Sequence, residues 1–222
     1  MTEYPILFSG PLVRAILAGT KTVTRRVVKE REFGRSDTPG YDWTFRDRRA
    51  LWNDLDHDDM MRRCPYGEPG HRLWVRETWG VFDAESDPQA VAIAYRADDH
   101  DGQRGECTWL EVPDDYAGRV PGPDERWRPS IHMPRWACRI ELDVLSVGVE
   151  RVQDITAEGA RAEGIDGNSN PGDFCMGREG NGYVSAFARL WDSINGKRPG
   201  CAWADNPWVW RIEFSRRVAA DA

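Results

Sequence analysis

The stretch LAGTKTVTRR, residues 17–26, places one glycine directly before a lysine, three threonines and two arginines. Upstream of it, Ser9 is a good helix N-cap, and a proline two residues later suits the first turn. Gly19 can end the helix in a left-handed conformation, so the sequence predicts a helix over residues 10–18. The alternation that follows predicts a strand over residues 23–28. The junction between the two elements therefore carries an unusual number of hydrogen-bonding side chains.

The chain has 222 residues, of which 40% are apolar and 30% are charged, as in ordinary soluble globular proteins. This length predicts one core and one domain over residues 1–216, with a frayed tail over residues 217–222. The N-terminus has no basic lead and is broken by Pro5 and Pro11, and no apolar run approaches the roughly 20 residues of a membrane span. We therefore expect a soluble, cytoplasmic protein with no membrane partner.

The five cysteines are odd in number, scattered and without a C-x-x-C pair, which predicts reduced thiols. Cys64, His57 and His71 lie near one another in sequence, but their spacing fits no standard zinc pattern. We therefore expect neither a metal nor an organic cofactor.

The net charge of −7 argues against a large, uniformly basic nucleic-acid surface. The charge is unevenly placed, however, because residues 14–35 hold seven basic side chains against two acids, and residues 83–126 hold twelve acids against four arginines. The two segments are either solvated faces of opposite sign or, for the first, a mouth that attracts anions. The 11 tryptophans leave a similar choice between core packing and platforms on which a base stacks.

Further elements follow from the apolar patterns. Period-two alternation predicts strands over residues 72–79, 90–97, 135–152 and 207–217. A short helix is predicted between a cap at Thr156 and a stop at Gly164, and a longer one over residues 185–196. With five or six strands, about three helices and no regular βαβ alternation, the chain is predicted to be an α+β domain whose sheet curls into a small β-barrel.

Three segments interrupt this pattern. They are rich in polar residues, glycine and proline, and we expect them to be loop insertions near residues 34–69, 97–129 and 166–183. The first of them is expected to contain one short helix.

Lys21 and Thr24 lie where the first predicted helix ends, and two roles are open for the lysine. It can cap the unsatisfied carbonyls of that helix end, which also carries a partial negative charge. Alternatively, its pKa is depressed and it takes the hydroxyl proton of Thr24, so that the two form a nucleophile pair. Positions three apart in a strand face opposite sides, so the second role requires Lys21 to lie in the turn before the strand.

Two glutamates are further candidates. Glu163 lies in the last turn of its predicted helix, where the dipole disfavours an anion by roughly 0.3 to 1 kcal/mol, so it is either a tolerated surface residue or one with a compensating cation. Glu77 shares its predicted strand face with Val75 and Trp79, so we expect its carboxylate to be buried and paired with an arginine or lysine. The alternative for Glu77 is that it accepts a hydrogen bond from an amino group of a substrate.

Four segments together resemble the ASCH domain family. They are LVRAILAGTKTVTRR (12–26), the strand G-x-x-LWVRE (70–77), the helix ITAEGARAEGI (155–165) and the closing strand NPWVWRIEF (206–214). The first contains the signature G-x-K-x-x-T-x-R, which is fairly specific beside the other three. The resemblance implies a PUA-like fold, a small β-barrel. The long, tryptophan-rich layout is most similar to the larger ASCH proteins often carried by bacteriophages and prophages.

The resemblance also implies an activity. Small bacterial ASCH proteins are amidohydrolases of N4-acetylcytidine, and the matching residues imply Lys21, Thr24 and Glu163 as the catalytic set. Arg26 would hold the oxygen of the base or the developing oxyanion. The other candidate substrate-binding residues are Arg25, Glu77, Trp74 and Trp79.

Two functions are therefore expected. The first is metal-independent hydrolysis of an acylated nucleobase or nucleoside by a Thr-Lys pair with a glutamate as proton relay. The alternative is an RNA-binding or nucleic-acid-binding PUA-like module without amidase activity, in which the basic segment over residues 14–35 grips phosphate. The expected partner is a modified nucleoside in the first case and RNA in the second.

Overall fold

The computed structural model describes residues 2–84, 90–99, 105–116, 118–124, 126–165 and 181–217. Within them the protein is a mixed α+β structure with eleven strands in three sheets and four α-helices. The strands are β1 (Glu3–Leu7), β2 (Val23–Val27), β3 (Arg31–Arg35), β4 (Trp43–Arg46), β5 (Trp52–Leu55), β6 (Arg72–Arg76), β7 (Trp79–Ala84), β8 (Ala90–Tyr95), β9 (Thr108–Glu111), β10 (Glu141–Arg151) and β11 (Trp208–Arg216). The helices are α1 (Gly10–Leu17), α2 (His57–Arg62), α3 (Ala157–Ala162) and α4 (Asn181–Asn195).

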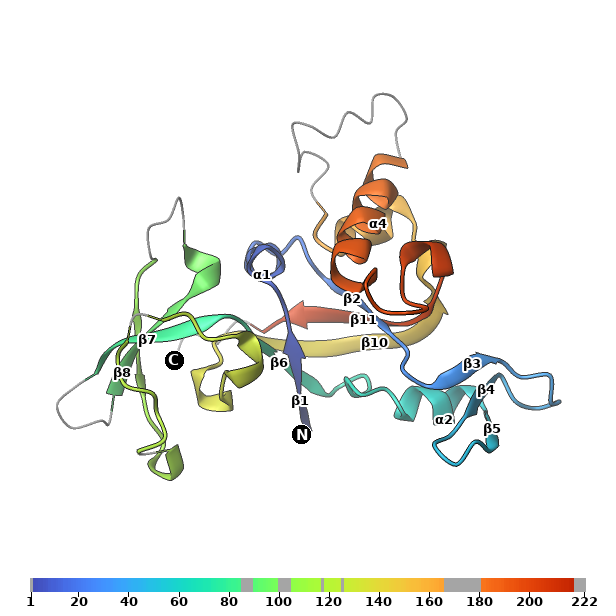
Figure 1. The fold of residues 1–222 in the computed structure, drawn as a ribbon, viewed down its shortest axis with the longest axis horizontal. Coiled ribbons are helices and arrows are strands. Elements are labelled where there is room, and N and C mark those ends of the chain that lie inside the picture. Colours follow the sequence, from blue (N-terminus) through green and yellow to red (C-terminus); the bar gives the residue numbers. More distant parts are fainter. Residues whose placement is uncertain are drawn as a thin grey trace.

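The main sheet has the strand order β1–β6–β10–β11–β2. Strands β1 and β6 run parallel, and the other neighbours are antiparallel. The long strands β10 and β11 form its centre, and α1 and α4 stand above it in Figure 1. Among the described residues the sheet does not close into a barrel, because β1 and β2 remain its two edges.

Two smaller antiparallel sheets lie at opposite ends of the molecule (Figure 1). One consists of β3, β4 and β5, and the other of β7, β8 and β9. The first occupies the segment near residues 34–69 that the sequence predicts to be loops, so that prediction is wrong except for the one short helix, which is α2. Strand β9 likewise lies inside the predicted loop insertion at residues 97–129.

The charged composition of these insertions hides their strands. In β4, for example, Trp43 and Phe45 are buried while the residues between and after them are partly exposed, which is a strand pattern only four residues long. The third predicted insertion, residues 166–183, lies outside the described residues except for its last three, which begin α4. Of the predicted frayed tail, Arg217 donates its backbone N–H to the Glu141 carbonyl, and residues 218–222 lie outside the described part of the chain.

The strand predicted over residues 72–79 is two strands. Strand β6 ends at Arg76, and β7 begins at Trp79 in a different sheet, so the chain turns at Glu77 and Thr78. The run predicted over residues 135–152 begins with the 3-10 turn η4 (Arg135–Ala137), and the strand starts only at β10.

The first helix begins and ends as predicted, with differences in detail. Ser9 occupies the N-cap position in extended conformation, but its side chain makes no capping hydrogen bond. Val13 and Ile16 are the buried residues of α1, while Leu12 and Leu17 are only partly buried against the core. None of the described helices is long and apolar enough to cross a membrane.

Among the residues that the structure describes, buried apolar side chains form three clusters, where the length of the chain predicts one core. The largest lies between the main sheet, α1 and α2. The second belongs to the sheet of β7, β8 and β9, and the third packs α3 and α4 against the opposite face of β11. The edge strand β2 runs between the first and third clusters, which is where the predicted catalytic residues lie.

Candidate active site

The start of β2 and the end of α3 are joined through the backbone. The N–H of Thr22 donates to the carbonyl of Ala162 at 2.8 Å, and Lys21 and Glu163 form an isolated antiparallel bridge. Because β2 is an edge strand, its open side is free to make this contact. Residues 142 positions apart in sequence are thus held side by side.

Two glycines permit the close crossing of these elements. Gly19, after α1, and Gly164, after α3, have φ angles of +74° and +83°, in the left-handed region that favours glycine. At Gly164 a Cβ atom would also lie 2.8 Å from the Ala15 side chain and 3.0 Å from that of Lys21. A larger residue at this position would push the two helix ends apart.

The ammonium group of Lys21 is buried, with the residue only 2% exposed. It donates to the Val23 carbonyl at 2.8 Å, the Glu163 carbonyl at 2.9 Å and Glu163 Oε2 at 2.6 Å. Burial lowers the pKa of Lys21, and the charge and hydrogen bond of Glu163 oppose this shift by stabilising the ammonium. The site therefore holds the lysine nearer to its neutral form than water would, in spite of its partner.

The two roles predicted for Lys21 can be compared with these bonds. The lysine does cap a helix carbonyl, but it is the carbonyl of Glu163, the residue that ends α3. At the end of α1, the Ala15 carbonyl instead accepts from the backbone N–H and the hydroxyl of Thr20 and from the N–H of Lys21. The nucleophile pair requires the Thr24 hydroxyl within about 3 Å of the Lys21 nitrogen or one water away. In this arrangement three other acceptors use the three ammonium protons, so Lys21 donates no direct bond to Thr24.

Of the two alternatives for Glu163, the tolerated surface residue is wrong, because the side chain is buried and has compensating cations. Its Oε2 binds Lys21, and its Oε1 accepts from Arg25 at 3.2 Å. The same guanidinium donates through Nε to Glu150 Oε1 at 2.7 Å. Arg25, predicted to bind substrate, lines the cavity described next and also links Glu163 to Glu150, a second role that sequence spacing does not reveal.

A cavity of about 290 Å³ opens beside this ion-pair network. Thr24, Arg26 and Glu163 line it, and the ammonium of Lys21 lies directly behind Glu163. Thr24 is 3% exposed and is paired directly with Ile212 of β11, a residue of the largest cluster. Its side chain therefore lies on the face of the sheet that carries this cluster. Two of the three predicted catalytic residues, Thr24 and Glu163, thus line one cavity, and the third, Lys21, is bonded to Glu163.

Arg26 is held at the wall of this cavity. Its NH2 group donates to the Leu7 carbonyl at 2.6 Å, and its guanidinium lies 5.0 Å from the centre of the Phe8 ring. Its Nε is buried and has no hydrogen-bond partner in the described part of the chain. Burial lowers the pKa of this guanidinium, while Tyr66 and Glu163 oppose the shift. An unpaired buried donor is costly, so Arg26 is prepared to receive an acceptor atom.

The rest of the cavity wall is absent from the sequence-based predictions. Tyr66 comes from the turn after α2, in a segment predicted to be an insertion, and burial raises the pKa of its phenol. Helix α4 supplies the remaining side, through Phe187, Leu190, Trp191, Ile194 and Asn195, followed by Arg198. These residues reach the site through long-range packing, for which the local pattern gives no signal.

Glu77 is buried and paired, as predicted, but it lies away from this cavity. Arg139 binds its two carboxylate oxygens at 2.9 and 3.0 Å, and the same guanidinium binds Asp98. Burial raises the pKa of Glu77, while Arg139 opposes the shift. The internal ion pair, rather than a substrate contact, accounts for this carboxylate.

The two tryptophans predicted to contact substrate do not line the cavity either. Trp74 lies on the face of β6 opposite to the buried Leu73 and Val75, where Arg76 lies 5.3 Å from its ring. Trp79 is fully buried in the second cluster and borders a separate cavity of about 400 Å³. Trp79 belongs to a different sheet from Thr24, and two strands, β10 and β11, lie between the strand of Trp74 and that of Thr24.

No group of His, Cys, Asp and Glu side chains suited to hold a metal ion occurs in the part of the chain that the structure describes. Comparison of the sequence with protein-family models and with curated proteins, and of the fold with solved structures, finds no match.

Proposed function

We propose that this protein is an amidohydrolase of the ASCH type that removes the acyl group from an acylated nucleobase or nucleoside such as N4-acetylcytidine. Thr24 is the nucleophile, Lys21 its base and Glu163 the proton relay. The proposal is supported by a cavity lined by Thr24 and Glu163, with the ammonium of Lys21 2.6 Å from Glu163 Oε2. The proposed chemistry uses side chains alone.

The reaction starts by a proton transfer inside the buried pair. Moving one ammonium proton of Lys21 onto Glu163 gives a neutral amine and a carboxylic acid, which burial favours over two charges. Lys21 then exchanges its bond to the Val23 carbonyl for the hydroxyl of Thr24, because catalytic hydrogen bonds often tighten only when substrate is bound. The Thr24 oxygen attacks the acyl carbonyl carbon, and its proton passes to Lys21.

Collapse of the tetrahedral intermediate breaks the bond between the acyl carbon and the amine nitrogen. Glu163 gives its proton to the leaving amine, so Lys21 is again an ammonium, Glu163 a carboxylate, and the acyl group is an ester of Thr24. A second transfer from Lys21 to Glu163 prepares the attack of water, whose proton goes to Lys21. Glu163 then protonates the Thr24 oxygen as the carboxylic acid leaves.

Two arginines support these steps. Arg25 holds Glu163 between Lys21 and the cavity by its bond to Oε1. Arg26 offers its unpaired Nε–H to the oxygen of the base or to the oxyanion that develops on the acyl carbonyl. A donor placed in advance lowers the barrier without reorganisation during the reaction.

The proposal extends to the fold. We assign the five strands of the main sheet to the barrel of the PUA-like class, with β1 and β2 as the strands that face each other across α1. The side-chain bond from Arg26 in β2 to the Leu7 carbonyl at the end of β1 supports this assignment, since it joins the two edges.

Incubation of the purified protein with N4-acetylcytidine, with acetate and cytidine measured by mass spectrometry, tests the activity. We expect turnover by the wild type and its loss by on the order of a thousandfold or more in Thr24→Ala. Thr22→Ala, an exposed threonine two residues earlier, is the matched control and should keep full activity. No turnover at high enzyme concentration would eliminate this substrate, and an active Thr24→Ala would eliminate the nucleophile.

A further inference from the structure

A strongly basic cavity adjoins the candidate active site. It has a volume of about 530 Å³ and lies between the end of β2 and the sheet of β3, β4 and β5. Five cations and two acids line it, a local excess of three positive charges in a chain whose net charge is −7. The cations are Lys29, Arg31, Arg46, Arg48 and Arg63, and the acids are Glu30 and Asp47.

The two cavities meet at Lys29, which lines both. The turn after α2 makes a second connection, because it contributes Arg63 to the basic cavity and Tyr66 to the candidate active site. A molecule whose one end occupies the space beside Thr24 can therefore extend along Lys29 into the basic cavity.

Most of the positive charge there is not neutralised within the protein. In the described part of the chain, Lys29, Arg31 and Arg48 form no ion pair, and Arg46 pairs with Glu32 at the surface. Oδ1 of Asp47 accepts hydrogen bonds from two backbone N–H groups of its own loop. The cavity is thus prepared for an external anion.

An exposed aromatic ring lies beside these cations. Trp52 is 59% exposed and lies directly opposite Arg46 across the β4–β5 pair. Residues opposite each other in an antiparallel pair share a face of the sheet, so the indole is on the same face as Arg46. A tryptophan next to a basic groove is the arrangement that stacks the bases of single-stranded nucleic acids.

We infer that the substrate of this site is a single strand of nucleic acid rather than a free nucleoside. The acylated base enters the cavity beside Thr24, its backbone phosphates follow Lys29 into the basic cavity, and a neighbouring base stacks on Trp52. The nature of the reacting base rests on the proposed function, whereas the phosphate contacts stand on the geometry of the basic cavity alone.

Binding of an unmodified strand tests the phosphate contacts without any chemistry. The probe is a fluorescein-labelled oligocytidine RNA of about ten nucleotides, followed by fluorescence anisotropy between 50 and 200 mM salt. In the double variant Arg31→Gln/Arg48→Gln we expect the Kd to rise about tenfold at the lower salt concentration, and the slope of log K against log salt to fall by about 1.4.

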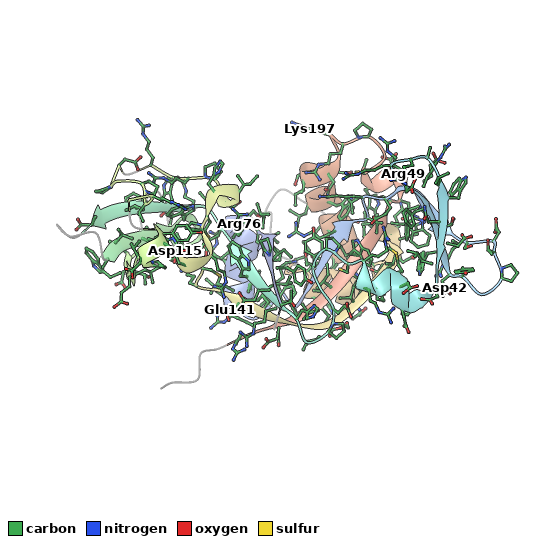
Figure 2. All side chains as sticks on the ribbon, turned by 90° about the horizontal axis from the view of Figure 1, so that it is seen from below. Asp42, Arg49, Arg76, Asp115, Glu141 and Lys197 are labelled. Atoms are coloured by element: carbon green, nitrogen blue, oxygen red, sulfur yellow. The ribbon has the colours of Figure 1, made fainter. Side chains whose placement is uncertain are left out.

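The matched control also removes two positive charges, but at the other end of the molecule. Arg119→Gln/Arg126→Gln changes two exposed arginines of the segment that follows Asp115. Figure 2 shows Asp115 at the opposite end of the molecule from Arg49 and Asp42. Its Kd should stay within about twofold of the wild type. Equal weakening in the two double variants would mean that net charge alone drives binding, and would overturn the inference.

Competition separates the sources of phosphate. Unlabelled oligocytidine should displace the probe at least tenfold better than cytidine monophosphate, and cytidine should be the weakest competitor. Equal competition by the monophosphate would show that one phosphate suffices for binding, and would overturn the inference that the substrate is a strand. Equal competition by cytidine would overturn any phosphate contact.

Hydrolysis of an acetylated strand and of N4-acetylcytidine completes the test. We expect a higher kcat/KM for the strand, and a loss of this preference in Arg31→Gln/Arg48→Gln. If the strand binds through these arginines and neither compound is hydrolysed, the proposed hydrolase fails and the phosphate-binding surface stands. If N4-acetylcytidine is hydrolysed and strand binding is the same in the double variant, the hydrolase stands and this inference fails.

Discussion

Lys21 has a structural role in addition to the chemical role that we propose for it. Its ammonium satisfies two buried carbonyls and the carboxylate of Glu163, so it joins α3 to β2. Removing one partner of a buried ion pair leaves the other charge uncompensated and typically costs about 3–5 kcal/mol. A loss of activity in a single variant of Lys21 would therefore report both effects together.

A pair of variants separates the two effects. Lys21→Met keeps the apolar stem and should lower the free energy of unfolding by about 3 kcal/mol and abolish hydrolysis. In Lys21→Met/Glu163→Gln both charges are gone, so much of the stability should return while hydrolysis stays absent. Urea unfolding followed by circular dichroism and turnover of N4-acetylcytidine give the two readouts. Activity in the double variant would remove both residues from the mechanism.

Glu77 makes stability depend on pH. Burial raises its pKa above the ordinary value of 4.5 in spite of Arg139, so between these two values the folded protein binds more protons than the unfolded chain. The stability that this group contributes is therefore fully present below pH 4.5 and is lost as the pH rises through the raised pKa. Glu77→Gln lacks this dependence.

The measurement is the free energy of unfolding of both proteins between pH 4 and pH 7. The difference between wild type and Glu77→Gln should be most favourable to the wild type at the acidic end and should decline with increasing pH. A difference that grows with pH would mean that the ion pair with Arg139 outweighs burial.

At the scale of the elements, local signals predict what local chemistry determines. Thr156 accepts a hydrogen bond from the Gly159 N–H and caps α3, and Gly164 ends that helix, both as the sequence predicts. The alternation of β11 also holds, with Trp210, Ile212 and other residues of that face buried. Helix caps, helix-ending glycines and long alternating strands each depend on a few neighbouring residues, so a short window of sequence predicts them.

Other elements depend on contacts that no window of sequence contains. Strands of four residues in charged segments, such as β4 and β5, are stabilised by each other and by the core they cover. The chain breaks after β6 because β6 pairs within the main sheet, whereas β7 pairs within the sheet of β7, β8 and β9. The same holds for the site, because the convergence of Lys21 and Glu163 came from a family resemblance, and Tyr66 and the wall from α4 had no signal at all.

The crossing of α3 and β2 gives a prediction at this scale. Gly164→Ala would combine an unfavourable positive φ with a Cβ only 2.8 Å from Ala15, whereas Gly19→Ala has a similar φ and open space around the new methyl group. We expect Gly19→Ala to lower the free energy of unfolding by about 1 kcal/mol and Gly164→Ala by about 2–4 kcal/mol.

The two glycines should also differ in activity. Gly164→Ala displaces the backbone beside Lys21 and Glu163 and should reduce kcat, while Gly19→Ala should leave it close to that of the wild type. Thermal unfolding and N4-acetylcytidine turnover of the two variants provide the comparison. Equal effects of both substitutions would show that the contact with Ala15 is not what positions the pair.

At the scale of the whole molecule, the described residues form three apolar clusters joined by a few specific contacts. Arg139 connects the start of β10 to Glu77 and Asp98 near the sheet of β7, β8 and β9. At the other end, Trp43 stacks on Phe33 and meets the edge of Trp208 in β11, with ring centres 5.2 Å apart in both pairs. These contacts hold the two outer sheets against the main sheet. The contacts of Trp43 thereby also position the walls of the candidate active site and of the basic cavity.

The last prediction concerns this anchoring, and the inserted sheet offers its own control. Trp43 is 2% exposed and packs on the main sheet, while Trp52, in the neighbouring strand, is 59% exposed. Trp43→Ala should lower the free energy of unfolding by about 3–5 kcal/mol, and Trp52→Ala should change it by no more than about 0.5 kcal/mol. Urea unfolding followed by circular dichroism avoids the lost fluorescence of the replaced indole.

Strand binding and hydrolysis should respond differently to these two substitutions. Trp52→Ala removes only the stacking platform, so it should weaken binding of the oligocytidine strand while leaving hydrolysis of N4-acetylcytidine intact. Trp43→Ala loosens the sheet of β3, β4 and β5, and the chain segments before and after this sheet carry Lys29 and Tyr66. This variant should therefore impair both strand binding and hydrolysis. If Trp43→Ala unfolds the protein outright, Trp43→Phe, which keeps a ring in the stack, should restore part of the stability and of both activities. A stable and fully active Trp43→Ala would mean that the inserted sheet does not position the site.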